Sequence, residues 1–289
     1  DASGLFTAYS STVDLKGSGD LANPNSGSEF YRLKTASSGN TTTCAGVFRT
    51  RFLEVGAGTL ALGTYDGHTV GTGCADGDKI LTVDANATFS GNWLYFSPPT
   101  TGTATFDGFD GGSISVIVHA GGDTVQQVTR GLTLGWLDLR TGTFDANDQD
   151  VTVNGQINLS GNTNSPALLC RSGTVTCDNL LIEVTTGNPT LDLGSSTFYC
   201  ADAFDVGGTN ATVTPGTSTL ILNGSSGTSA ISLYGESLND VQVNASGKTY
   251  ELAGDFSCNG TLTMQDGTLN TSNGTVYDMT AGGLDVQGG

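Results

Sequence analysis

The side chains best placed to do chemistry in this chain are oxygen donors gathered in one short loop. Asp145, Asn147, Asp148 and Asp150 bring four such side chains into six residues between two apolar runs. Oxygen ligands on a flexible turn suit Ca²⁺, although an EF-hand would need Gly at the sixth position of the loop. The sequence therefore predicts a calcium site here and no other cofactor. The alternative is a plain turn, since Asp and Asn are turn-forming residues.

Other carboxylates raise the alternative of a β-helical hydrolase or lyase that acts on polysaccharides, because a glycosidase needs two carboxylates across a groove. Against it, residues 141–289 contain only Arg171 and Lys248 as basic side chains, too few for a lyase that neutralises acidic sugars. His68 and His119 lie in no G-x-S-x-G context. We therefore expect no enzymatic activity. The carboxylates that could line a groove are Asp107, Asp110, Asp123, Asp138 and Asp192.

Three aromatic side chains are candidates for stacking on sugar rings, namely Trp93, Tyr95 and Trp136. Strand alternation places Trp93 and Tyr95 on one face and Leu94 and Phe96 on the other, and one of these faces must be core. Large aromatics more often belong to a core or an interface. Binding of surface glycans is therefore one interpretation of these residues, and a place in the core or an interface is the other.

Six cysteines occur without any C-x-x-C pair, which argues against a structural zinc site. They could form disulfides, and Cys44–Cys74 and Cys170–Cys177 are the pairs with the best setting. Alternatively, the cysteines are small buried hydrophobic residues inside the fold.

The chain is acidic, with 28 Asp and Glu against 10 Lys and Arg and a net charge of −18. So few cations cannot follow a phosphate backbone, and the acidic surface is repelled by anionic lipid. No run approaches the ~18 apolar residues that a membrane span requires. We expect neither nucleic acid nor a membrane as a partner.

Short apolar runs alternate with turns rich in Gly, Ser, Thr and Asn, and helical periodicity is absent. An octet of the form L-x-[LM]-x-x-[GS]-T-[FL] recurs at 137–144, 191–198 and 262–269. Strand-turn units with an L-x-L core recur about every 8–12 residues. The chain is therefore predicted to be all-β and a parallel β-solenoid, with a β-sandwich as the alternative.

Two regions differ in composition. Residues 1–130 hold most of the basic side chains and longer loops, and are predicted to be an N-terminal β region that caps or anchors the fold. Residues 131–289 are predicted to be the solenoid stack. Solenoid ends need covering because an open coil exposes unpaired strand edges, so we expect a homo-oligomer or contact with other subunits of one assembly.

Segments such as 191–198 followed by 217–224, and 143–147 followed by 151–153, resemble the repetitive β-helical proteins of phage virions and bacterial surface adhesins. The resemblance covers about 131–289. It implies a structural or adhesive role, as a fibre, tail-associated or capsid-decoration component, in an extracellular or virion location. It implies no catalytic residue.

Overall fold

The computed structural model describes residues 10–21, 29–35, 38–65, 67–98, 102–160, 164–183, 186–207, 210–271, 275 and 277–287. The chain is all-β and forms a parallel β-solenoid of about 11 turns, which confirms the predicted fold class. The sandwich alternative is wrong, because strand ladders in every part of the described chain are parallel. None of the described residues belongs to a helix long and apolar enough to cross a membrane.

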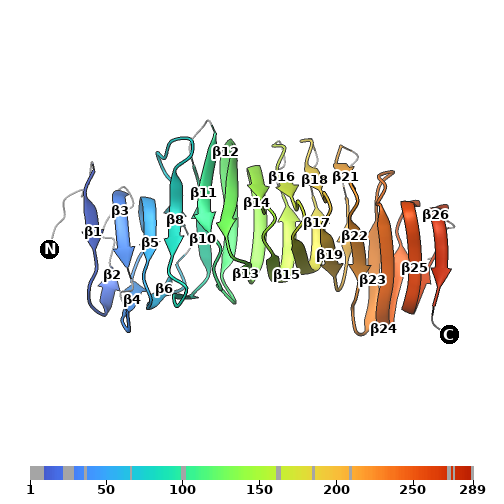
Figure 1. The fold of residues 1–289 in the computed structure, drawn as a ribbon, viewed down its shortest axis with the longest axis horizontal. Coiled ribbons are helices and arrows are strands. Elements are labelled where there is room, and N and C mark those ends of the chain that lie inside the picture. The colour runs from blue at the N-terminus through green and yellow to red at the C-terminus, as the bar shows by residue number, and fades with distance from the viewer. Residues whose placement is uncertain are drawn as a thin grey trace. The chain divides into compact units, whose positions relative to one another are not determined.

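The chain divides into two compact units, Asp1–Phe144 and Asp145–Gly289. Figure 1 labels their strands. Unit 1 contains β1 (Thr12–Asp14), β2 (Gly19–Leu21), β3 (Glu29–Thr35), β4 (Thr41–Cys44), β5 (Arg49–Val55), β6 (Thr59–Ala61), β7 (His68–Val70), β8 (Lys79–Val83), β9 (Thr88–Ser90), β10 (Trp93–Phe96), β11 (Thr103–Asp107), β12 (Ser115–Thr129), β13 (Leu132–Leu134) and β14 (Trp136–Asp145), which reaches the boundary. Unit 2 contains β15 (Val151–Leu159), β16 (Ala167–Leu169), β17 (Thr174–Ile182), β18 (Thr190–Asp192), β19 (Thr197–Cys200), β20 (Phe204–Asp205), β21 (Thr212–Thr214), β22 (Thr219–Leu222), β23 (Gly227–Ser232), β24 (Asp240–Leu252), β25 (Phe256–Asn270) and β26 (Met279–Val286).

In unit 1 the coils build three sheet faces. One face stacks β1, β3, β5, β8, β11 and the second half of β12. The next stacks the start of β5, then β7, β10, the first half of β12, and β14. The third is the sheet β2-β4-β6-β9. Parallel pairing thus already begins at β1, well before residue 131, where the sequence predicted the stack to start. A capping or anchoring role for residues 1–130 stays a prediction.

In unit 2 the strand register shows the true repeat. One inward column consists of Val151, Val175, Phe198, Leu220, Val241, Leu262 and Leu284. Successive members lie 24 residues apart at Val151 and Val175 but 21 apart at Val241 and Leu262. Each coil therefore adds one side chain per column, while turns of variable length join its strands.

The octet noted in the sequence is not this repeat. Its third copy starts at Leu262, which shares a column with Phe198, the last residue of the second copy. The first copy lies wholly inside β14, whereas the second spans β18, a turn and β19. The octet recurs because an L-x-L pair and a Thr-aromatic pair suit many positions of a strand with one buried face.

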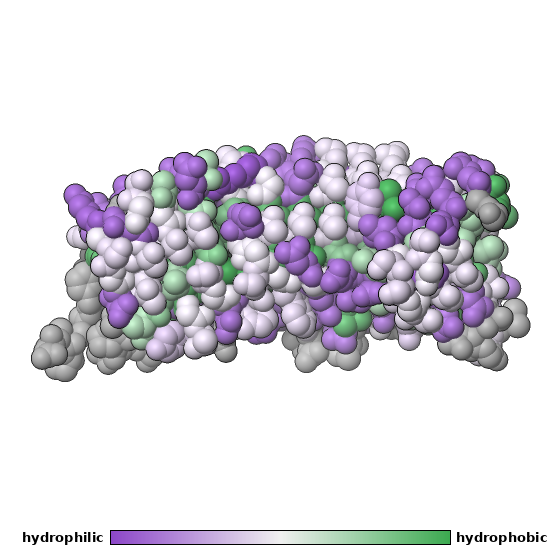
Figure 2. All heavy atoms as spheres, turned by 90° about the horizontal axis from the view of Figure 1, so that it is seen from below, coloured by the Kyte–Doolittle hydropathy of each residue, from purple (hydrophilic) through white to green (hydrophobic). Residues whose placement is uncertain are grey.

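Alternating burial builds the core. Strands such as β19 and β22 bury every second side chain, so Leu220 and Leu222 face inward while Thr219 and Ile221 face outward. Outward positions are weakly polar, and pale side chains predominate on the face that Figure 2 shows. Tight stacking of turns requires glycine at Gly216, where φ is +55° and a Cβ would lie 2.0 Å from the carbonyl oxygen of Gly194.

Candidate functional site

The most distinctive surface of unit 1 is an aromatic patch on β10, β12 and β14. Trp93 and Trp136 are 43 residues apart in sequence, yet their ring centroids lie 6.3 Å apart with an angle of 47° between the ring planes. Trp136 is 39 % exposed, which is unusual for so large an apolar side chain. Tyr95 lies on the same face as Trp93, and Leu94 and Phe96 face inward, as the alternation predicted.

The sheet register explains why the two rings meet. β12 lies between β10 and β14, and Ser115 of β12 pairs directly with Trp93. The amide of Gly135 donates to the carbonyl oxygen of Ile114 at 2.8 Å, which places Trp136 beside Ser115 on the other side. The tryptophans are thus two strands apart, about 10 Å between backbones. The small side chain of Ser115 leaves room for both rings to lean together.

Polar groups border the rings. Asp138 is buried and accepts a hydrogen bond from Nε of Arg140 at 2.8 Å, while the Arg140 side chain is 47 % exposed. Partial burial on its own lowers the pKa of Arg140, but hydrogen bonds to Asp138 and Tyr95 outweigh it and raise that pKa. The guanidinium is therefore a fixed cation beside Tyr95. Ile117 faces outward but is buried, so neighbouring side chains of the patch cover it.

We call Trp93, Tyr95, Trp136, Asp138 and Arg140 the aromatic patch. The three aromatic residues were candidates from sequence for stacking on sugars, and Asp138 was a candidate groove carboxylate. Arg140 was missed, although the alternation Trp136-x-Asp138-x-Arg140 places all three on one strand face. Exposed rings beside directional polar groups suit ligands with both apolar faces and hydroxyl edges. The patch can hold such a ligand but has no nucleophile paired with a base.

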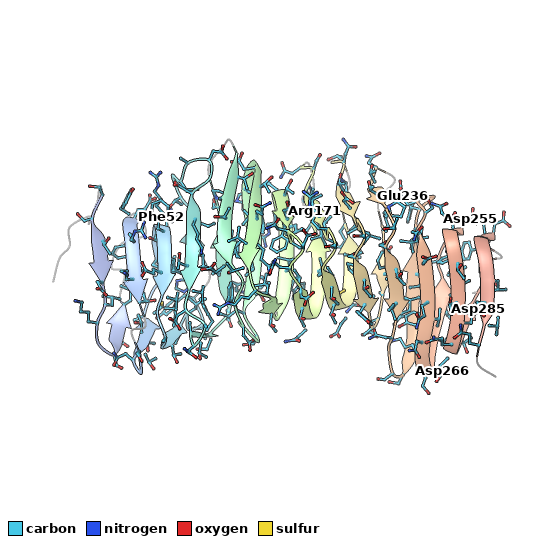
Figure 3. All side chains as sticks on the ribbon, in the orientation of Figure 1. Phe52, Arg171, Glu236, Asp255, Asp266 and Asp285 are labelled. Atoms are coloured by element: carbon cyan, nitrogen blue, oxygen red, sulfur yellow. The ribbon has the colours of Figure 1, made fainter. Side chains whose placement is uncertain are left out.

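The carboxylate oxygens of the loop at 145–150 accept hydrogen bonds from the next coil of unit 2. Nε and Nη2 of Arg171 donate to the two carboxylate oxygens of Asp145 at 3.0 and 2.9 Å (Figure 3). Hydrogen bonding to Asp145 is the main cause that raises the pKa of Arg171. Asp148 accepts from the amide and hydroxyl of Ser172, and Asp150 from the amide of Thr174. These carboxylates thus hold the following coil in place.

These contacts agree with the turn interpretation of the loop. Asn147 and Asp148 have φ of 50° and 61°, the left-handed conformation that Asn and Asp tolerate best among residues with side chains. The described part of the chain has no group of three or more His, Cys, Asp or Glu side chains placed to hold a metal ion. Calcium binding by Asp145, Asn147, Asp148 and Asp150 stays a prediction.

The carboxylates considered for a polysaccharide groove have structural partners. Asp107 pairs with Nζ of Lys79 at 2.6 Å and accepts from the hydroxyl of Thr129. Asp110 and Asp192 each accept from the amide two residues ahead, as in ordinary turns. Asp138 belongs to the aromatic patch. Asp123 is the exception, because one of its oxygens has no partner.

All six cysteines are free and buried. The disulfide interpretation, including Cys44–Cys74 and Cys170–Cys177, is therefore wrong, and the alternative of small buried hydrophobic residues is right. Cys177 and Cys200, for example, are register neighbours on the inward face of β17 and β19. Burial raises the pKa of Cys44 to about 12 and is the main cause that raises the pKa of Cys74 to about 11. Such thiols are poor nucleophiles.

Neither histidine lies in a catalytic setting. His68 starts β7 and is buried against Phe48, with ring centroids 4.7 Å apart. Its Nε2 lies 2.9 Å from the carbonyl oxygen of Leu62, so the ring satisfies backbone groups. His119 is exposed and lies inside β12.

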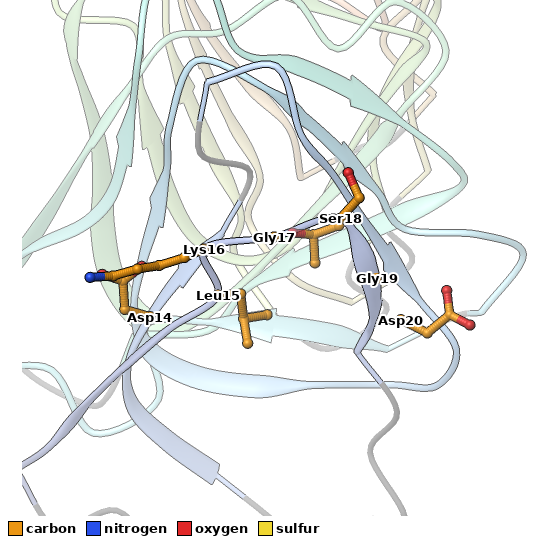
Figure 4. A pocket seen from close by; sticks show the side chains of 8 residues that line it. Asp14, Leu15, Lys16, Gly17, Ser18, Gly19 and Asp20 are labelled. Atoms are coloured by element: carbon orange, nitrogen blue, oxygen red, sulfur yellow. The ribbon is translucent and has the colours of Figure 1, made fainter.

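A shallow hollow in unit 1 is lined by residues 14–20 and Thr42 (Figure 4). Leu15 is its one large apolar side chain. Lys16 lies 3.9 Å from Asp14, and both side chains are largely exposed, so this ion pair is weak. The hollow has no aromatic ring, and its Ser18 hydroxyl already accepts from the amide of Thr41, so the hollow is a poorer site than the aromatic patch.

Comparison of the chain with protein-family models, with curated proteins and with solved structures gave no match.

Proposed function

We propose that this chain is a structural, adhesive protein of a virion or a cell exterior, and that it binds glycans through the aromatic patch. The observation that carries the proposal is the ring pair on one outward strand face, in which Trp136 is exposed and Trp93 is half-buried. The resemblance to repetitive β-helical virion proteins and adhesins supports the same role. No specific observation favours the hydrolase or lyase alternative.

The two indole rings of the patch are costly to keep in contact with water and are attached to a rigid backbone. Placing two indole rings partly in water loses the free energy that burial of each would contribute, ~2 kcal/mol for a large apolar side chain. Their backbones are held by parallel ladders, so a ligand that stacks on them orders little of the protein. Sugar rings have apolar C–H faces and hydroxyl edges, and the Arg140 guanidinium can donate to those hydroxyls.

The charge of the chain narrows the ligand class. A net charge of −18 repels polyanionic glycans over long distances. The one cation of the patch, Arg140, is already paired with Asp138. We therefore propose a neutral glycan as the partner, in an extracellular or virion setting, with neither nucleic acid nor a membrane as a ligand.

The surface of β26 supports a proposed assembly role. Leu284 and Val286 are 63 % and 65 % exposed, whereas Leu262, the register partner of Leu284, is buried. A surface with such side chains favours contact with a further polypeptide. We propose a second copy or another subunit of the same assembly. Sedimentation should show self-association that Leu284→Glu weakens; a stable monomer at micromolar concentration would contradict the homo-oligomer.

The glycan proposal is tested by binding to a panel of immobilised neutral and acidic glycans. We expect retention on neutral glycans, and a loss of about 30-fold in affinity for Trp136→Ala or Trp93→Ala, as for a central aromatic hot spot of ~2 kcal/mol. Tyr234→Ala is the matched control, because Tyr234 is an equally aromatic, 57 % exposed residue of unit 2. Equal binding by wild type and both tryptophan variants would contradict the proposal.

A further inference from the structure

Asp123, in the middle of β12, is a buried carboxylate with one oxygen unsatisfied. The residue is only 6 % exposed. Its Oδ1 accepts a hydrogen bond from the amide of Gly102 at 3.1 Å, which places the carboxylate against Gly102. Its Oδ2 is inaccessible to solvent and has no hydrogen-bond partner in the described structure. A buried, unpaired carboxylate oxygen is costly, so its presence calls for a ligand.

A second carboxylate approaches the same backbone from the opposite coil. The amide of Thr103 donates to Oδ1 of Asp76 at 2.7 Å. Thr103 pairs with Thr124, the residue after Asp123, and the amide of Thr124 donates to the carbonyl oxygen of Gly102. Asp76 and Asp123 thus lie on the two coils that flank the coil of Gly102.

Gly102 lets the Asp76 carboxylate lie close against the middle coil. Its φ is +117°, and a Cβ at this position would lie 2.4 Å from Oδ1 of Asp76. A side chain here would therefore displace the Asp76 carboxylate. The two flanking coils are about 10 Å apart between backbones. Two aspartates leaning toward the middle coil can share one cation, because Ca²⁺–oxygen distances are about 2.4 Å.

The guanidinium of Arg51 does not neutralise the carboxylates of Asp76 and Asp123. Nη2 of Arg51 pairs with Oδ2 of Asp78 at 3.0 Å, and Asp78 also accepts from the amide of Ala75. Burial is the main cause that raises the pKa of Asp123; the hydrogen bond from Gly102 opposes this, and the charge of Asp76 adds to it. The charge of Asp76 thus reaches Asp123 and is not cancelled there.

We propose that Asp76 and Asp123 bind one hard divalent cation, Ca²⁺, over Gly102, and that the ion ties three successive coils of unit 1 together. Oxygen-only donors with two carboxylate charges suit Ca²⁺ rather than a thiol- or imidazole-seeking metal. The site is separate from the loop at 145–150 and does not depend on glycan binding.

The test is calorimetric titration of the chelator-treated protein with CaCl2 at physiological salt, together with melting temperatures with and without the ion. Asp76→Asn and Asp123→Asn keep the oxygen that accepts from the backbone and remove only the charge. Asp110→Asn removes the same charge elsewhere in unit 1, and Asp148→Asn does so in the 145–150 loop. Circular dichroism checks the fold of each variant.

We expect wild type, Asp110→Asn and Asp148→Asn to bind Ca²⁺ and to melt at a higher temperature with it. Asp76→Asn and Asp123→Asn should lose at least about tenfold in affinity and lose the thermal shift. Three results would overturn the proposal: no Ca²⁺ binding by wild type, unchanged binding by both Asn variants, or loss of binding in Asp148→Asn instead. A wild type that binds no Ca²⁺ overturns the proposal whether or not the variants fold.

Discussion

Lys248 offers a test of how the acidic stack of unit 2 tolerates a buried charge. The side chain lies in β24 and is 4 % exposed, and its Nζ forms an ion pair with Oδ1 of Asp202. The ammonium also lies 5.8 Å from the centroid of the Tyr250 ring. A buried charge of this kind is tolerated only while its partner is present.

Removing either partner should therefore have unequal effects. Asp202→Ala leaves the ammonium buried without a counter-charge, a change that typically costs 3–5 kcal/mol for a fully buried pair. The Asp202 side chain is 48 % exposed, and water can partly replace it, so we expect about 2 kcal/mol. Lys248→Met removes the charge but keeps most of the volume, so its stability should stay within about 1 kcal/mol of wild type.

Hydrogen exchange of the β24 amides, with thermal melting of the whole chain, measures both effects, because a solenoid opens coil by coil. The double variant Lys248→Met with Asp202→Ala should resemble Lys248→Met alone. If the β24 amides lose as much protection from hydrogen exchange in Lys248→Met as in Asp202→Ala, the ion pair stabilises the stack through direct attraction. The cost of burying the Lys248 charge would then not explain the effect of Asp202→Ala.

Three further outcomes are expected. The buried thiols, with pKa values of about 12 at Cys44 and about 11 at Cys74, should resist alkylation until the chain unfolds, and a reductant should leave the melting temperature unchanged; a drop would indicate a disulfide. Burial alone raises the pKa of Asp107, but hydrogen bonds from Lys79, Thr129 and the amide of Val83 hold that pKa below its usual range. The ionised Asp107 carboxylate therefore stabilises the fold above its unfolded pKa of about 3.9, and this stabilisation is lost as the pH falls through the lower folded pKa. Asp107→Asn should make the melting temperature less dependent on pH in acid. An unchanged pH dependence would contradict this role of Asp107. Gly216→Ala should lower the free energy of unfolding by about 2–4 kcal/mol, because the new Cβ would lie 2.0 Å from a carbonyl oxygen. Gly235→Ala, with positive φ but no atom within 4 Å of the new Cβ, should lower it by about 1 kcal/mol. Equal losses in the two variants would mean that backbone strain, and not the clash, causes both.

The fold class could be read from the sequence because inward and outward residues alternate along each short strand. Leu220 and Leu222 are buried on either side of Ile221, the pattern that an L-x-L core predicts. The coil length could not be read in the same way, because turns change it from 24 to 21 residues and blur any fixed period. Copies of a pattern such as the octet then share residue types but do not occupy equivalent positions in the coils.

The site was predictable only in parts. Alternation was enough to place Trp93 and Tyr95 together, and it could also have grouped Arg140 with Trp136. No local pattern could bring Trp93 to Trp136, since their proximity depends on which strand lies between them and on the small Ser115 there. The unpaired oxygen of Asp123 was equally hidden, because it follows from the stacking of three coils around Gly102.

Glycan binding by the aromatic patch can be measured on the unlabelled protein. The chain has two tryptophans, and both lie in the patch, so tryptophan emission excited selectively over the eight tyrosines reports on this site. Titration with a neutral glycan retained in the binding panel should give a saturable change in emission, and Tyr95→Ala should weaken it while Tyr234→Ala leaves it unchanged. A glycan that binds the protein without altering tryptophan emission, or the absence of any bound glycan, would contradict the account.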